Sequence, residues 1–188
     1  MNDYPRYVKS NLLQLIDEMA DYPELFVKNP GKDFTRTRKL NFKEIIQLLL
    51  SMGGKSLGSE LTDYFSYDVN SLSASAFIQQ REKLLPVAFE FLLHEFINSF
   101  LSLKTFNGYR LLAVDGSDLH IARNPEDTET YFRSQQDSKG YNLLHLNAMY
   151  DLCNNIYVDT VIQGRQTSDE YKALIDMVDR SNISEKVI

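Results

Sequence analysis

Residues 109–116 read Tyr-Arg-Leu-Leu-Ala-Val-Asp-Gly, a short apolar run that ends in a carboxylate and a glycine. Successive side chains of a strand point to opposite faces, so Leu111 and Ala113 share one face, and the leucine and valine between and after them share the other. Because both faces are apolar, the run predicts a central strand that is covered on both sides and ends at Gly116. Asp115 would then close a buried strand, which is costly unless protonation, a basic partner or a divalent cation compensates its charge. The alternative is that Asp115 turns outward and caps the following loop.

The residues after this run predict further strands and a helix. Residues 117–140 are mostly polar and are left as an uncertain connection, whereas residues 141–152 and 156–163 predict two strands. The Asn-Asn turn between these two strands favours an antiparallel hairpin. Thr167, with Glu170 three residues later, predicts a capping box at the start of an amphipathic helix.

The closing Val187-Ile188 predicts the opening of a fourth strand in this region. The order strand, strand, strand, helix, strand is typical of the start of a ribonuclease-H-like domain. We therefore expect an α+β protein. A helical, DNA-binding-like region at residues 1–105 would precede a truncated ribonuclease-H-like mixed sheet with helices at residues 106–188. His145, within the second strand, is expected to be a packed or hydrogen-bonded core side chain.

The first half of the chain predicts helices, because its apolar residues follow a spacing of 3.6 residues. Polar or proline residues mark where each of these helices should start. The expected starts are Ser10, Asn41 (with Glu44 completing a capping box), Ser56, Ser73 and Pro86.

Basic side chains gather in one segment, residues 28–43, which we call the basic segment. The whole chain carries 20 Lys and Arg against 26 Asp and Glu, a net charge of −6. The basic segment nevertheless holds six Lys and Arg against one Asp, which leaves it at +5. Local potential attracts phosphates more than total charge does, so this segment predicts a DNA contact, the alternative being a solvated loop. Its DNA-binding candidates are Arg36, Arg38, Lys39 and Lys43.

The helix expected from Ser73 to about Leu84 offers a second DNA-binding candidate. Ser75, Gln79 and Lys83 follow one another at i, i+4 and i+8 on its polar face. Gln can pair with adenine edges and Lys with guanine or phosphate, so this face would suit a major groove, in a unit spaced like a helix-turn-helix. The alternative is the solvated face that every amphipathic surface helix has.

Three stretches of the chain resemble a known family. Residues 112–119, Leu-Ala-Val-Asp-Gly-Ser-Asp-Leu, resemble the first catalytic block of insertion-sequence transposases of the DDE class, the IS-four type. Residues 72–84 resemble the helix that precedes the catalytic domain in these proteins. Residues 141–164 resemble their strand pair with its Asn-rich turn. The resemblance covers roughly residues 35–188.

The resemblance implies a ribonuclease-H-like catalytic domain in which three acids hold two Mg²⁺ ions. Asp115 matches the first acid and is therefore the expected catalytic residue and metal ligand. Such enzymes cleave DNA with water and join the 3′-OH to target DNA, with one metal at the attacking oxygen and one at the leaving oxygen. The family's second Asp and later Glu have no match in this chain, and Asp118, Asp176 and Asp179 do not replace them. We expect no strand transfer by this polypeptide alone.

The partners that the resemblance implies are Mg²⁺ in the intact catalytic site and the double-stranded DNA of transposon ends. It also allows a homodimer of the intact protein. A single cysteine, Cys153, excludes an internal disulfide and fits a reducing cytoplasm. No run of 18 apolar residues occurs, so a membrane span is not expected. The alternative functions are a non-catalytic DNA-binding module and a regulatory or decayed remnant.

Overall fold

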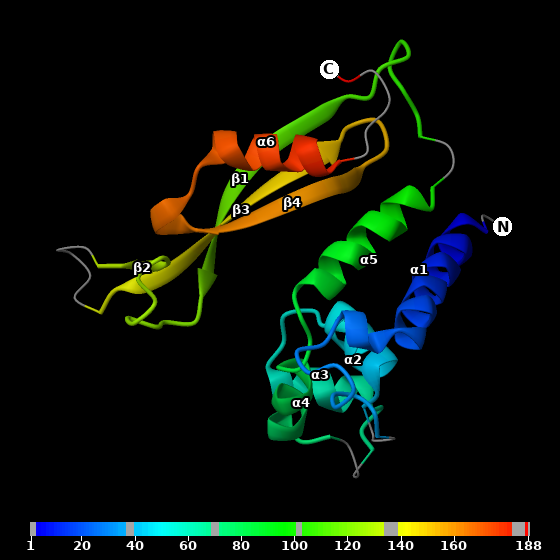
Figure 1. Cartoon of the computed structure of the whole chain (residues 1–188), viewed down its shortest axis with the longest axis vertical. Helices are drawn as coiled ribbons and strands as arrows, with labels where there is room; N and C mark the ends of the chain where they lie inside the picture. The colour runs from blue at the N-terminus through cyan, green and yellow to red at the C-terminus, as the bar shows by residue number, and fades with distance from the viewer. Residues whose placement is uncertain are drawn as a thin grey trace. The chain divides into compact units, whose positions relative to one another are not determined.

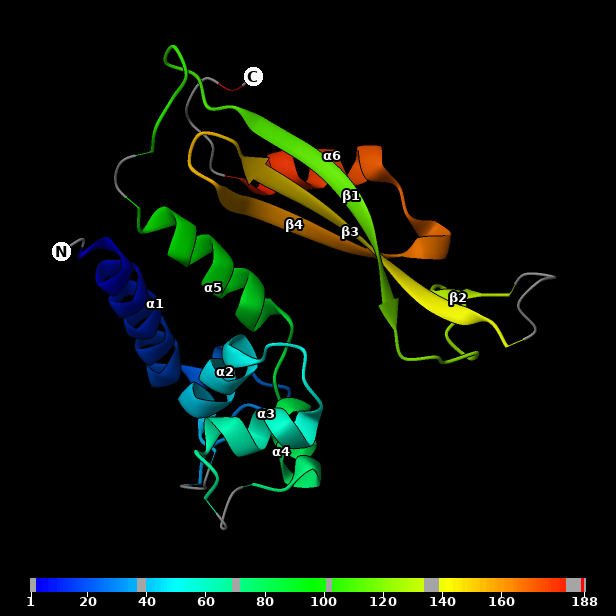
Figure 2. The same ribbon diagram turned by 180° about the vertical axis from the view of Figure 1, so that it is seen from behind.

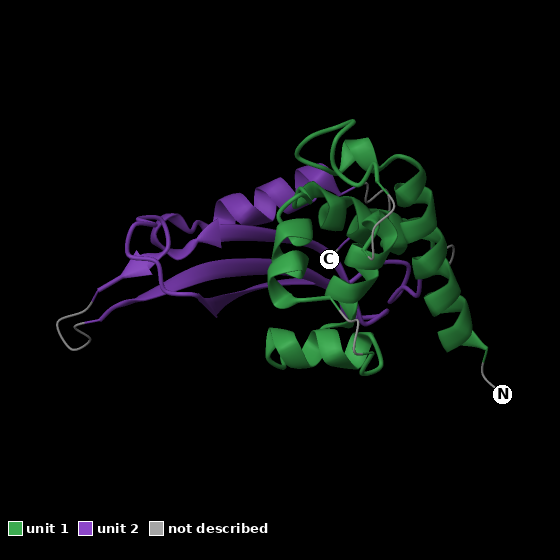
Figure 3. Ribbon diagram, turned by 90° about the horizontal axis from the view of Figure 1, so that it is seen from below, with its two compact units in different colours: residues 1–99 green, residues 100–188 purple. Residues whose placement is uncertain are grey.

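The computed structural model describes residues 3–36, 40–68, 72–100, 103–133, 139–181 and 187. The chain forms two compact units, Met1–Ser99 and Phe100–Ile188, which Figure 3 colours separately. The fold class is α+β, with helices in the first unit and a sheet with one α-helix in the second (Figure 1). None of the described helices is both long and apolar enough to cross a bilayer.

The first unit consists of helices around one apolar core. They are α1 (Tyr4–Asp21), α2 (Phe42–Ser51), α3 (Leu57–Tyr64), α4 (Ala74–Arg81) and α5 (Val87–Asn98), with a 3-10 turn at Pro23–Leu25. Side chains from several of these helices are fully buried together, among them Ile16, Ile45, Leu48 and Phe77. The apolar faces that the sequence predicts therefore meet in a shared core.

Of two helix starts predicted from the sequence in this unit, one is confirmed and one is wrong. The capping box at Asn41 is confirmed, because Asn41 Oδ1 accepts from the Glu44 N–H and Glu44 Oε2 accepts from the Asn41 N–H, both at 2.9 Å. The start at Ser10 is wrong, since α1 begins at Tyr4. Pro5 lies in its first turn, where the missing N–H of proline leaves no intrahelical hydrogen bond unmade.

The predicted end of α4, at about Leu84, is also wrong. The helix stops at Arg81, and the chain then turns so that Leu84 forms an isolated antiparallel bridge with Val27. A backbone hydrogen bond of 2.8 Å from the Lys28 N–H to the Lys83 carbonyl supports this bridge. The bridge ties the start of the basic segment to the turn that follows α4.

The second unit is built on a four-stranded antiparallel sheet rather than the mixed sheet that the sequence predicts (Figure 1, Figure 2). Its central strand is β3 (Tyr141–Asp151), with β1 (Leu112–Ile121) on one side and β4 (Ile156–Gly164) and the short β2 (Tyr131–Phe132) on the other. The expected strands over 141–152 and 156–163 and their hairpin are confirmed to within one residue at each end.

β1 departs most from its prediction. It begins at Leu112 and runs through Gly116 to Ile121, so Asp115 lies inside the strand instead of at its end. Its side chains are half-buried or exposed, and along its length β1 pairs only with β3 in the part of the chain that the structure describes. A central strand covered on both faces is therefore wrong, because an apolar run reports hydrophobicity and not the presence of covering elements.

A helix covers one face of this sheet. A 3-10 turn at Arg165–Thr167 leads into α6 (Glu170–Arg180), and Figure 2 shows α6 along the sheet. Met177 of α6 packs on Met149 and Val158 of the strands.

The two ends of α6 connect it to the rest of the unit. The residue that caps it is Asp169, whose carboxylate accepts from the Lys172 N–H at 2.9 Å, so the capping role expected of Thr167 is wrong. Further along, Val187 forms an isolated parallel bridge with Arg110, directly before β1. In chain order, α6 therefore follows the antiparallel strands β1 to β4 and precedes the parallel bridge of Val187 with Arg110.

Candidate functional site

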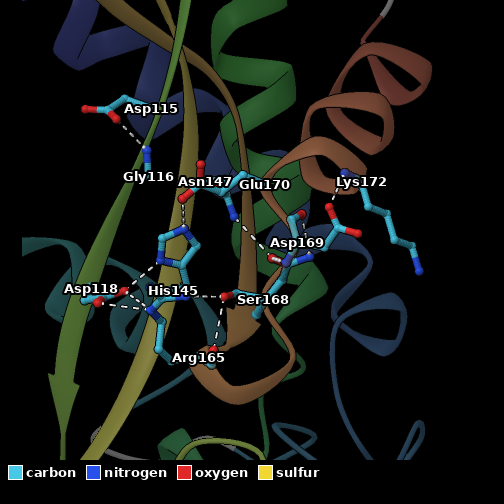
Figure 4. A network of polar contacts seen from close by, with 11 residues as sticks. Asp115, Gly116, Asp118, His145, Asn147, Arg165, Ser168, Asp169, Glu170 and Lys172 are labelled. Atoms are coloured by element: carbon cyan, nitrogen blue, oxygen red, sulfur yellow. Dashed lines mark hydrogen bonds and ion pairs between the residues drawn. The ribbon is translucent and has the colours of Figure 1, made fainter.

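Asp115 lies in the middle of β1, on the face of the sheet away from α6. Leu112 packs on the α6 side of the sheet, and a Cβ at Gly116 would point to the same side, toward His145 and Asn147. Because successive residues of a strand point to opposite faces, Asp115 points to the other side. The Asp115 Oδ1 accepts from the Gly116 N–H at 2.9 Å (Figure 4). The Asp115 side chain is exposed, and its register partner is Ala148. An exposed carboxylate stays hydrated, so Asp115 is not a buried charge that needs protonation, a basic partner or a divalent cation to compensate it. It points outward, as in the alternative reading, but from within the strand and not as the cap of a loop.

Asp115 by itself supplies one carboxylate to a cation. Within the described ranges, no group of three or more His, Cys, Asp or Glu side chains is placed to hold a metal ion. Mg²⁺ retains several waters and takes one or two carboxylates together with substrate phosphate oxygens. Asp115 can therefore supply one ligand to a cation whose other ligands are water and substrate phosphate, and it does not by itself form a two-metal centre.

The helix-covered face holds a polar network that the sequence reasoning missed (Figure 4). His145 is buried, with Nδ1 2.7 Å from Asp118 Oδ1 and Nε2 3.2 Å from Glu170 Oε1. Arg165 donates through Nε to the other Asp118 oxygen at 3.1 Å. These four side chains join β1, β3 and the start of α6.

This network gives Asp118 a structural role. The hydrogen bond with His145 holds the pKa of the Asp118 carboxyl below its usual range, and Arg165 acts in the same direction. Asp118 belongs to β1 and not to a turn, because the strand continues past Gly116. The expectation of a hydrogen-bonded His145 is confirmed. Spacing could not reveal the pair, since its members are 27 residues apart and meet only through strand register.

Two buried aspartates hold other parts of the same unit. Asp151 accepts from Arg110 Nε at 3.0 Å and from two backbone N–H groups of the turn after β3. Asp159 accepts from an Arg180 nitrogen at 3.0 and 3.1 Å, which ties the end of α6 to β4. Because each carboxylate is paired with an arginine and hydrogen-bonded, the cost of burying its charge is compensated within the unit.

In the helical unit, two predicted DNA-binding residues from different segments meet at one cavity of about 350 Å³. Arg36 comes from the basic segment and Lys83 from the turn after α4, and Lys32 and Gln80 also line this space. Lys83 Nζ donates to Gln80 Oε1 at 2.9 Å and lies 5.4 Å from the centroid of the Phe34 ring. The antiparallel bridge after α4 explains the meeting, because it places the two segments side by side.

The expected polar face of α4 is only partly present. Ser75 and Gln79 are exposed on the helix. Lys83 lies beyond the last helical residue, Arg81, and is half-buried at the cavity. A row of three along one helix is therefore wrong, and two side chains remain on it.

The other basic candidates differ in their surroundings. Lys43 forms an ion pair with Asp17 of α1, so part of its charge is balanced within the unit. Arg38 and Lys39 lie outside the described residues. Of the described candidates in the basic segment, Arg36 lines the cavity.

Comparisons of this chain with family models, with curated proteins and with solved structures found no match. Function is therefore inferred from two features of the chain itself. These are the position of Asp115 in the sheet and the basic cavity of the helical unit.

Proposed function

We propose that the chain is part of a DNA transposase of the DDE class. In this proposal the helical unit binds duplex DNA, and Asp115 is the first metal-binding acid of a ribonuclease-H-like unit. The observation that carries the proposal is the position of Asp115 within the strand order. The three long antiparallel strands, β1, β3 and β4, are followed by α6 across one face, and Val187 then pairs in parallel with Arg110 beside the strand that bears Asp115.

The surroundings of Asp115 support this role. Its face of the sheet is the one that α6 leaves uncovered, and the residue opposite it is the small Ala148. A hydrated cation and a phosphodiester need such open access to a carboxylate. When bound, divalent cations activate the attacking oxygen and stabilise the leaving oxygen. Asp115 would hold one cation, and we expect no strand transfer from this chain on its own.

A second candidate function is a non-catalytic DNA-binding module. The observation that favours it is the meeting of Lys32, Arg36 and Lys83 at one cavity, which needs no role for Asp115. Both candidates predict DNA binding, and they differ in whether Asp115 holds a cation.

Manganese binding tests the role of Asp115. Mn²⁺ takes the same oxygen ligands as Mg²⁺ and broadens the NMR signals of nearby amides even when it binds weakly. Titration of the ¹⁵N-labelled chain should broaden the signals of Asp115 and Ala148 first, and Asp115→Asn should abolish this effect. Asp179→Asn, which removes an exposed carboxylate of α6, is the matched control and should change nothing at β1. Broadening that survives Asp115→Asn would refute the metal-binding role.

A salt series tests DNA binding itself. The affinity of the full chain for a duplex should fall between 50 and 200 mM salt, with a log–log slope of about −0.9 for each phosphate contacted. A duplex affinity that does not depend on salt, or no binding at all, would refute both candidates. DNA binding without broadening at Asp115 would leave the non-catalytic module.

A further inference from the structure

The basic cavity offers more than accumulated positive charge. Residues 31–36 and Leu40 form one side of it, and Gln80 and Lys83 form the other. The two sides are held together by backbone hydrogen bonds, one of them the 2.8 Å bond from the Lys28 N–H to the Lys83 carbonyl. The cavity is therefore built between two fixed pieces of backbone and does not depend on chance contacts of long side chains.

Lys83 is positioned at this cavity before any ligand arrives. Its side chain is half-buried, with Nζ 2.9 Å from Gln80 Oε1 and 5.4 Å from the Phe34 ring centroid. A lysine ammonium has three N–H donors, and Gln80 uses one of them. Two donors and the full charge thus remain for a ligand, and less side-chain entropy is lost when it binds.

Gln80 adds a neutral donor. Its side chain is 7% exposed, and its oxygen is identified by the contact with Lys83, because an ammonium can only donate. The amide nitrogen of Gln80 consequently points elsewhere, and it has no hydrogen-bond partner among the described residues. The amide nitrogen is not enclosed, so it reaches the open cavity and can donate to a ligand oxygen there.

The charge around the cavity favours an anion. Lys32 and Arg36 are exposed at its rim, so with Lys83 they make three cations. Asp33 also lines the cavity, but it is 7% exposed and its Oδ2 accepts from both the backbone N–H and the side-chain amide of Asn29, at 3.0 Å each. Its carboxylate is thus engaged by its own loop.

We propose that this cavity is a phosphate-binding site, in which Lys83 and Arg36 supply charge and Gln80 supplies a neutral hydrogen bond. Its volume of about 350 Å³ exceeds what a bare ion needs and lies at the small end of ligand pockets, so a phosphate with its attached sugar suits it. The phosphate belongs either to a DNA backbone or to a free nucleotide. Only the DNA assignment rests on the proposed function.

An NMR titration of the full ¹⁵N-labelled chain with three probes tests the site. The probes are inorganic phosphate, deoxyadenosine monophosphate and a 12-base-pair duplex. We expect amide shifts that cluster on residues 31–36 and 80–83 with all three, at the lowest concentration with the duplex. Shifts with the nucleotide but none with the duplex would keep the phosphate site and remove the DNA-binding proposal. Duplex binding that shifts only amides elsewhere, with no cavity response to any probe, would overturn the site and leave DNA binding standing.

Two variants and a matched control complete the test. Lys83→Met keeps an unbranched side chain of similar length and removes the ammonium that lies over the Phe34 ring, and Arg36→Gln removes the charge at the rim. Each should weaken duplex binding by about tenfold or more, as expected for a hydrogen bond to a charged group, and reduce the salt slope by about 0.9. Lys28→Gln removes one charge from the same segment at an exposed residue that does not line the cavity. Equal weakening by all three would overturn the site in favour of general basic charge.

Discussion

Gly116→Ala should destabilise the second unit, although alanine is ordinarily better than glycine inside a strand. A Cβ at Gly116 would lie 2.6 Å from His145 Nε2, 2.9 Å from His145 Cε1 and 3.3 Å from Asn147 Oδ1. Non-bonded carbon contacts are favourable only near 3.5–4.0 Å, so the imidazole would have to move. It cannot move freely, because the ring is buried and its Nδ1 is held by Asp118 at 2.7 Å.

The size of the effect follows from two opposing contributions. Forcing a methyl group into a packed site costs about 1–3 kcal/mol, whereas replacing glycine in a strand interior recovers about 0.5–1 kcal/mol of backbone entropy. The difference spans about 0–2.5 kcal/mol, and the approach of 2.6 Å to His145 Nε2 places the expected net loss in the upper half of that range. This is a large share of the 5–15 kcal/mol typical of a small domain.

Denaturant unfolding, followed by NMR signals of the second unit, measures this loss. The same change at Gly58 of α3, where no atom lies within 4 Å of the added Cβ, is the control and should stabilise its own unit by about 0.5–1 kcal/mol. In a His145→Ala background most of the cost should disappear, because the contacts at 2.6 and 2.9 Å are gone and only the 3.3 Å contact with Asn147 Oδ1 remains. An unchanged or raised stability of Gly116→Ala in the wild-type background would refute the reasoning.

Three further predictions concern buried or capped polar groups. The pKa of Asp118 is lowered on folding, so the charged carboxylate stabilises the folded second unit above the unfolded-state pKa of about 3.9, and this contribution is lost as the pH falls. Asp118→Asn should therefore reduce the free energy of unfolding at pH 7 and reduce it much less at about pH 2. Asp151→Ala removes the buried carboxylate that accepts from Arg110 Nε and should cost about 3–5 kcal/mol in unfolding of the second unit, and a value below about 1 kcal/mol would contradict the pairing. Asn41→Ala removes the capping box with Glu44 and should lower the melting stability of the first unit by about 1 kcal/mol while leaving amide signals of the second unit unchanged.

Features set by neighbouring residues were predictable from the sequence. The capping box at Asn41 needs only a spacing of three, and the strands of the hairpin at residues 141–152 and 156–163 are short, apolar or alternating, and joined by a turn. The extent of β1 was not predictable in this way. Gly116 looks like a strand terminator, yet it is needed inside the strand because the His145 ring from β3 occupies the place of a side chain.

The candidate site likewise combines features that the sequence predicts with features that depend on tertiary structure. Asp115 can be located on β1 from its apolar run, but its exposure depends on which face α6 covers, and that is a tertiary property. Lys83 was assigned to a helical face because the pattern continues past the real end of α4. Its proximity to Arg36 arises from an antiparallel bridge between distant segments, which residue spacing does not encode.

The outer edge of β1 has a practical consequence for work with this chain. Along Leu112–Ile121 the strand pairs only with β3 within the described part of the chain, so a row of N–H and C=O groups faces outward. Such a row is a template for any incoming strand, including the same strand of another molecule. Apparent stability and particle size should therefore be compared at dilute and concentrated protein before any energy is assigned to a single side chain.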